Sequence, residues 1–179
     1  MLEAMNEPDE VWARKLDEAL RKAKAAERGD VAEYLLLRTA NDAIRRASVD
    51  WLLDSATVIA AESDRQNARI TIEKENPHSF TAGHANLVGS RLTFRQGVRC
   101  LTIEAGWTRA PQDGFMRGGA LARARLSHFG MSRNDEELLL VRDGDVTNWF
   151  AVDKENKREL FDSRNLQRHF AIFSGELSS

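Results

Sequence analysis

An arginine-rich stretch in the middle of the chain holds the residues best suited to chemistry. Residues 91–133 contain eight arginines and no lysine, opposed only by Glu104 and Asp113, so this stretch carries a net charge of +6. The flanking residues 1–90 and 134–179 each sum to −4. A guanidinium group holds a phosphate or carboxylate through two parallel hydrogen bonds, which an ammonium group does not do. Recognition of an anion is therefore the chemistry that residues 91–133 favour.

The segment from Asp113 to Arg125 places three glycines close to arginines. Glycines let neighbouring backbone amides point into one concavity, which suits an anion. The Ala- and Leu-rich residues 119–129 predict a helix whose free N-terminal amides would add to this attraction. We expect a non-catalytic binding module for an anionic small molecule or an acidic protein segment. The candidate ligand-binding residues are Arg117, Gly118, Gly119, Arg123 and Arg109.

Two other interpretations of residues 91–133 stay open. Gly118-Gly119 lacks the ending and the preceding buried strand of a phosphate loop, so the glycines can simply connect two elements while the arginines pair with the acidic flanks. Aromatic residues also alternate with the arginines and can stack on the bases of a nucleic acid. Against nucleic acid stands the net charge of −2 for the whole chain. These aromatic residues are Phe94, Trp107, Phe115 and Phe129.

The four histidines make a weaker case for metal or acid–base chemistry. His78 and His84 lie six positions apart in an expected loop, and their spacing matches no metal motif. His128 is expected near the end of the helix 119–129, where an imidazolium complements the helix dipole. His169 is expected at the boundary of the apolar stripe of the last helix. We expect no metal and no cofactor.

No catalytic motif is present in the sequence. A Gly-x-Ser-x-Gly elbow, a Walker loop and a dinucleotide-binding fingerprint are all absent. Catalytic groups also assemble from distant positions, so an unrecognised enzyme stays an alternative to the binding module. Convergence of His84, Asp113 and Glu104 in one cleft would favour that alternative.

Residues 1–62 predict a layer of helices that would hold the central stretch in place. Apolar residues recur every three or four positions from Val11 to Ala23 and again from Leu35 to Ile44, and Gly29 marks a break between two helices. The pattern continues through residues 51–61, where either Ser48 begins a third helix or the second helix runs on. The exposed apolar surface of such a hairpin makes a structural protein that homodimerises through these helices an alternative function.

Residues 63–162 predict mainly antiparallel strands. The clearest hairpin joins residues 91–95 to residues 98–107 through Gln96-Gly97, so that Leu92 opposes Leu101 and Phe94 opposes Arg99. One face of this hairpin collects the apolar side chains and is expected to face the core. These side chains are Leu92, Phe94, Leu101, Ile103, Ala105 and Trp107.

A second meander and a closing helix complete the expected fold. Alternating apolar residues predict strands from Glu137 to Phe161, with a turn at Asp143-Gly144-Asp145. Residues 163–174 predict a helix that Ser163 caps and Gly175 ends. The expected fold class is α+β: an N-terminal helical hairpin packed on an antiparallel sheet, with a C-terminal helix.

Length and composition predict one domain spanning residues 1–179. The chain has 42% hydrophobic residues, enough for one substantial core. Its longest apolar runs, such as Leu138 to Val141, are far shorter than a membrane span, and the first ten residues carry no basic side chain for a signal peptide. With Cys100 as the single cysteine, an intrachain disulfide is excluded. We expect a cytoplasmic protein that does not bind membranes.

Overall fold

The computed structural model describes residues 7–65 and 69–177, although the side chains of residues 7–9, 64, 65, 111 and 117 lie outside the described part. The chain divides into two compact units, residues 1–46 and 47–179, and each is described by itself. The single domain expected from the sequence stays a prediction. Among the described residues, no helix is long and apolar enough to span a membrane.

The first unit is a pair of helices. It contains α1 (Glu7–Ala25) and the opening part of α2 (Gly29–Arg65). The indole Nε1 of Trp12 donates a hydrogen bond to the Asp42 carboxylate at 3.2 Å. The predicted pair of helices is confirmed, and α2 runs on past Ser48 without a new start. The small apolar core of this unit is formed by Leu16, Ala23 and Leu35.

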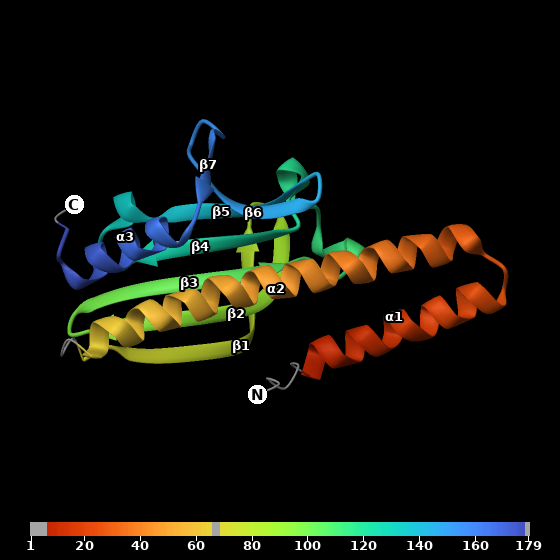
Figure 1. Cartoon of the computed structure of the whole chain (residues 1–179), viewed down its shortest axis with the longest axis horizontal. Coiled ribbons are helices and arrows are strands. Elements are labelled where there is room, and N and C mark those ends of the chain that lie inside the picture. The colour runs from red at the N-terminus through yellow and green to blue at the C-terminus, as the bar shows by residue number, and fades with distance from the viewer. Residues whose placement is uncertain (1–6, 66–68, 178–179) are drawn as a thin grey trace. The chain divides into compact units, whose positions relative to one another are not determined.

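The second unit is built on a seven-stranded antiparallel sheet whose strands follow one another in chain order. The strands are β1 (Thr71–Ala82), β2 (Ala85–Gln96), β3 (Arg99–Trp107), β4 (Ala122–His128), β5 (Glu136–Asp143), β6 (Val146–Val152) and β7 (Arg158–Phe161). Three short 3-10 helices lie in its connections: η1 (Pro111–Asp113), η2 (Arg117–Gly119) and η3 (Ser132–Asn134). The helix α3 (Ser163–Ser174) follows β7 (Figure 1). The predicted α+β fold class is confirmed.

One face of the sheet carries the main core. Residues 47–65 of α2 and the helix α3 cover this face, and Figure 1 shows both helices lying along the strands. Every apolar side chain expected on the core face of the β2–β3 hairpin is buried there, as the alternation of the strands predicts. The core members from α2 and α3 are Val49, Leu52, Leu53, Ala56, Ala60, Leu166, Phe170 and Phe173.

The residue that caps the N-terminus of α3 differs from the expected one. The side chain of Asp162, and not that of Ser163, accepts hydrogen bonds from the backbone amides of Arg164 and Asn165, at 2.8 and 3.3 Å. A carboxylate at this position satisfies amides that have no partner within the helix. Gly175 ends α3 in the left-handed conformation, with a φ of 84°, as predicted.

The helix predicted for residues 119–129 is wrong, because residues 122–128 form strand β4. Their burial alternates at every second position: Ala122, Ala124 and Leu126 are buried, whereas the arginines between them point to the other face. Alanine and leucine favour helices when a segment stands alone, but a period of two lets this segment bury one face between β3 and β5. Tertiary packing therefore overrides the local helix propensity.

The register of the β2–β3 hairpin is shifted by two residues from the prediction. Phe94 lies opposite Leu101, Leu92 lies opposite Ile103, and the turn is made by Gly97 and Val98. A shift of two positions keeps every side chain on its predicted face, because side chains alternate with a period of two. The core face was therefore predicted correctly although the pairing was wrong.

A paired glycine contact accompanies a bend in the hairpin of β1 and β2. Gly89 lies opposite Gly106, and a Cβ atom at Gly89 would collide with the carbonyl oxygen of Ala105. The register of β1 against β2 also shifts between Glu75 and His78. Beyond these positions, the yellow-green end of the hairpin turns away from the plane of the other strands in Figure 1. The close backbone approach that glycine permits thus brings the β1–β2 turn over the face opposite the core.

Candidate anion-binding cleft

A cleft of about 350 Å³ lies on the face of the sheet opposite the core. The bent end of the β1–β2 hairpin, the loop between β3 and β4, and the turn between β6 and β7 form its rim, and side chains of β4, β5 and β6 line its floor. Two arginines and a histidine line the cleft, and its described lining includes no carboxylate. The lining residues are Ala82, Gly83, His84, Phe115, Gly118, Arg123, Leu139, Val152, Asn156 and Arg158.

Arg123 is the basic residue of the cleft floor. It lies on β4 opposite Leu139 of β5, on the face that α2 and α3 do not cover. Its side chain is 22% exposed, and its Nη2 is 3.9 Å from a carboxylate oxygen of Glu137, which is a loose ion pair. Its buried Nε has no hydrogen-bond partner among the described residues. A buried donor without a partner is costly, but this Nε has no surface open to the cleft. The Nη groups, which Glu137 pairs with only loosely, are the donors available to an incoming acceptor.

Arg158 supplies the second guanidinium group from the first residue of β7. Its Nη2 donates to the carbonyl oxygen of Gly118 at 3.0 Å. A Cβ atom at Gly118 would lie 2.5 Å from the same Nη2, and the φ of Gly118 is 72°, a conformation that favours glycine. The positive φ is thus the reason that glycine is favoured at position 118, since the flexible end of Arg158 could move away from a Cβ atom. The carbonyl oxygen of Gly118 carries no net charge, so this hydrogen bond does not compensate the charge of Arg158.

The structure brings together some of the predicted site residues and separates others. Gly118 and Arg123 line the cleft, while Gly119 is an exposed neighbour with a φ of 69°. Arg109 lies over the ring of Trp107, 3.9 Å from its centroid, and donates to the carbonyl oxygen of Val88 at 3.4 Å. The side chain of Arg117 lies outside the described residues. A 3-10 turn replaces the helix N-terminus expected after Gly119.

Sequence reasoning missed Arg158, His84 and Asn156 as residues of this cleft. Asn156 lies in the turn between β6 and β7 with a φ of 63°, and His84 lies in the turn between β1 and β2. Positions 84 and 158 lie outside the arginine-rich stretch 91–133, so its charge pattern gave no signal for them. The adjacent pair Lys157-Arg158 after a polar turn was the available sign of a basic site.

Several arginines of residues 91–133 pair with carboxylates, as the competing interpretation expected. A row of alternating charges crosses five strands on the face opposite the core, in the order Glu75, Arg91, Glu104, Arg125 and Glu137. The side chain of Arg91 contacts Glu75 at 2.5 Å, and Arg125 contacts Glu137 at 2.7 Å and Glu104 at 3.2 Å. The hydrogen bond to Glu137 raises the pKa of Arg125. These arginines support the sheet. Among the predicted arginines with described side chains, Arg123 is the one that lines the cleft, and Arg158 joins it from outside residues 91–133.

The aromatic residues of the nucleic-acid hypothesis fall into two groups. Phe94 and Trp107 are buried in the core, so they are not available for stacking on a base. Phe115 and Phe129 are exposed, and Phe115 lines the cleft. Of the four aromatic residues in the nucleic-acid hypothesis, Phe115 is therefore the one that lines the cleft.

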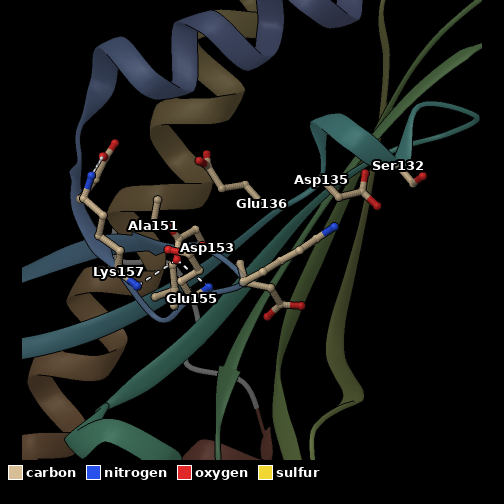
Figure 2. A pocket seen from close by; sticks show the side chains of 11 residues that line it. Ser132, Asp135, Glu136, Ala151, Asp153, Glu155 and Lys157 are labelled. Carbon is tan, nitrogen blue, oxygen red and sulfur yellow. Dashed lines mark hydrogen bonds and ion pairs between the residues drawn. The ribbon is translucent and has the colours of Figure 1, made fainter.

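A second cleft of about 720 Å³ is acidic (Figure 2). Figure 2 shows Glu136 and Asp135 on one side of it and the loop with Asp153, Glu155 and Lys157 on the other. Six carboxylates and two lysines line this cleft, which opposes the binding of an anion. Its lining residues are Ser132, Asp135, Glu136, Glu137, Ala151, Val152, Asp153, Lys154, Glu155, Lys157 and Glu159.

Two buried histidines behind the acidic cleft form a chain of hydrogen bonds with Glu136. Nε2 of His169 is 2.7 Å from the Glu136 carboxylate, and Nδ1 of His169 is 2.9 Å from Nε2 of His128. A carboxylate only accepts, so Nε2 of His169 carries its proton, and neutral His169 then accepts from Nε2 of His128. The remaining Nδ1 of His128 is buried without a described partner. Burial, and next the neighbouring His169, lower the pKa of His128 from 6.5 to about 4.

These positions correct the expectations for the histidines. His128 lies on a strand and not at the end of a helix, and His169 is 5% exposed and not a boundary residue. His78 is also buried, on β1, within hydrogen-bond distance of Glu75 and Glu104. Searching the described residues finds no group of three or more His, Cys, Asp or Glu side chains placed to hold a metal ion.

The residues that would favour an enzyme do not converge in the cleft. His84 lines it, but Asp113 accepts hydrogen bonds from the backbone amides of Arg109 and Ala110 at 3.0 and 2.8 Å. Glu104 contacts Arg125 and His78 within the charged row. Both carboxylates therefore have structural partners.

Comparison with known proteins adds no relative: no family model, no curated protein and no solved structure matches this chain.

Proposed function

We propose that the protein is a binding module for a small anionic ligand, held in the cleft between Arg123 and Arg158. The observation that carries the proposal is the composition of that cleft: two guanidinium groups, an imidazole and an amide line it, without a carboxylate among the described lining residues. Other arginines on this face contact glutamates closely, but for the described arginines of the cleft the one such contact is the 3.9 Å between Arg123 and Glu137. The cytoplasmic location expected from the sequence belongs to this proposal.

The volume of the cleft supports a small molecule over an acidic protein segment. About 350 Å³ lies at the lower end of the range for small-molecule sites, about 300–1,000 Å³. Guanidinium groups approaching from β4 and β7 suit a phosphate or carboxylate, because each can donate two parallel hydrogen bonds. The loosely paired Nη groups of Arg123 are the donors that such an anion would meet.

The experiment is calorimetric titration of the full chain with inorganic phosphate, pyrophosphate, ribose 5-phosphate and succinate at low and moderate salt. We expect at least one probe to bind, and we expect Arg123→Gln and Arg158→Gln each to weaken its binding about tenfold or more, within the range for a lost charged hydrogen bond. Arg142→Gln is the matched control: Arg142 is exposed at the β5–β6 turn and lies outside the cleft, so affinity should not change.

Three outcomes would contradict the proposal. The first is the absence of binding by every anion. The second is equal weakening by Arg142→Gln, which would indicate attraction by net charge alone. The third is that a short oligonucleotide, titrated beside these probes, binds while the small anions do not and that salt removes its binding, which would favour the nucleic-acid alternative.

A homodimer formed by the first unit is a second proposal, because large apolar side chains are exposed on α2. Tyr34, Leu36 and Leu37 are 58%, 50% and 56% exposed. An apolar group of this kind is typical of a surface that another molecule covers. We expect light scattering to report a dimer that Leu36→Lys/Leu37→Lys converts to a monomer. Glu62→Lys, an exposed position on the part of α2 that belongs to the second unit, should leave it a dimer. A strict monomer at high concentration would contradict this proposal.

A further inference from the structure

We propose that the ligand of the cleft carries a flat aromatic ring beside its anionic group, and that Phe115 is the side chain on which this ring stacks. This inference rests on the proposed function and specifies the class of ligand: a phosphate monoester that carries an aromatic ring, such as a nucleoside monophosphate. It follows from the exposure of Phe115, from the anchoring of its neighbours and from the apolar part of the cleft.

Phe115 is an exposed aromatic side chain at the rim of a basic cleft. It is 89% exposed, although a phenylalanine side chain gains free energy when its surface leaves water. The loop that carries it therefore leaves a large apolar surface unused in the absence of a ligand. A ring stacked on Phe115 would cover this surface while its anionic group reaches the guanidinium groups.

The residues on either side of Phe115 hold it in place. Gly114 has a φ of 93°, and a Cβ atom there would lie 3.0 Å from the carbonyl oxygen of His84, so the loop rests closely on the β1–β2 turn. Met116 packs into the apolar cluster of Ala82, Ala85 and Leu87. With both neighbours anchored, the backbone that carries Phe115 is held in place, so the binding of a ring does not also have to order the loop.

The remaining lining also suits a ligand larger than a bare anion. Leu139 and Val152 contribute apolar surface to the floor, beside the charged Arg123. His84 and Asn156 offer both hydrogen-bond donors and acceptors at the rim. An inorganic phosphate would contact the arginines and leave these groups untouched, whereas a nucleoside monophosphate has an anionic, a polar and a flat apolar part to match all of them.

The test compares AMP, adenosine and ribose 5-phosphate by calorimetric titration of the full chain. AMP contains both features, adenosine only the ring, and ribose 5-phosphate only the anionic group. We expect AMP to bind at least tenfold more tightly than either fragment. We expect Phe115→Ala to lower the affinity for AMP about tenfold and to leave the affinity for ribose 5-phosphate unchanged, since stacking of a base on an aromatic ring has this magnitude.

Matched variants separate stacking from general effects. Phe115→Leu keeps an apolar side chain without an aromatic face, and it should lose most of the same affinity for AMP. Phe129→Ala removes another exposed phenylalanine, which directly follows β4 and lies outside the cleft, and it should leave the affinity for AMP unchanged. Thermal unfolding of each variant confirms that the protein remains folded.

The outcomes distinguish this inference from the function on which it rests. Equal affinities for AMP and ribose 5-phosphate, or a loss for both ligands in Phe115→Ala, would overturn the stacking role while the anion site stands. Binding of adenosine as tightly as AMP would overturn the combination of ring and anion. Binding of none of the ligands would overturn the proposed function and this inference together.

Discussion

At the scale of single residues, charge type indicated where a site would lie, and partners decided which residues belong to it. Arg91, Arg123 and Arg125 lie on the same face of the sheet, yet Arg91 and Arg125 contact glutamates closely while Arg123 keeps an unpartnered Nε. This difference depends on the neighbours across the strands: Arg123 lies opposite Leu139, whereas Arg125 lies opposite Glu137. The arginines and glycines of residues 91–133 pointed to Arg123 and Gly118. The same pattern did not separate these residues from Arg109, which stacks on Trp107.

The lowered pKa of His128 also predicts that the stability of the protein depends on pH. Because the pKa of His128 is lowered in the folded protein to about 4, the unfolded chain binds a proton first as pH falls below about 6.5. The contribution of His128 is therefore complete above pH 6.5 and is lost between pH 6.5 and about 4, by at most about 1.4 kcal/mol per pH unit for one proton. The nearby charge of Asp135 raises the pKa of His128 and so moderates this loss.

Urea unfolding of the wild type and of His128→Gln between pH 7 and pH 4.5 checks this prediction. The glutamine side chain can donate to His169 as Nε2 of His128 does, but it does not titrate, so the free energy of unfolding should fall less steeply with decreasing pH. Arg142→Gln, an exposed position at the β5–β6 turn, is the control and should keep the wild-type slope, because an arginine does not lose its proton in this pH range. An identical slope in His128→Gln would show that another group carries the pH dependence.

At the scale of elements, local periodicity predicted well where it agreed with propensity and failed where the two disagreed. The helices of residues 1–62, the β5–β6 meander and α3 were predicted from the spacing of their apolar residues together with glycines that mark breaks, turns and helix ends. Residues 119–129 combine helix-forming alanines with a period of two, and strand β4 shows that the period decided. The bend at Gly89 and Gly106 had no signal beyond the glycines themselves, since the contact joins two strands.

The bend gives a prediction for Gly89→Ala. A Cβ atom at Gly89 would collide with the backbone of Ala105, which cannot move as a flexible side chain can. We expect a loss of at least about 2 kcal/mol in the free energy of unfolding, as for overpacking in a core, together with weaker binding in the cleft that the bent hairpin completes. Urea unfolding and ligand titration measure the two effects.

Gly29→Ala is the control for this substitution. No heavy atom lies within 4 Å of a Cβ atom at Gly29, so the change should leave stability unchanged or raise it slightly. Equal stability of Gly89→Ala and the wild type would contradict the role assigned to the glycine pair.

At the scale of the whole molecule, the main core belongs to the second unit by itself. Each residue of that core lies between Val49 and Phe173, within residues 47–179. We therefore expect a fragment of residues 47–179 to fold cooperatively and to bind the same anion as the full chain. Circular dichroism, urea unfolding and titration check this, and an unfolded fragment would show that the second unit depends on residues 1–46.

The sequence by itself determined the element types where periodicity was strong, the α+β class, the apolar face of the β2–β3 hairpin and the charge surplus of residues 91–133. These properties are local, because they depend on side chains a few positions apart in the chain. Only the tertiary structure decided that Arg123 and Arg158, 35 positions apart, line one cleft with His84, and that His128 and His169 share a hydrogen bond. Such contacts depend on strand register, on the bend at Gly89 and Gly106, and on which partners satisfy each buried charge, and none of these is written in the spacing of neighbouring residues.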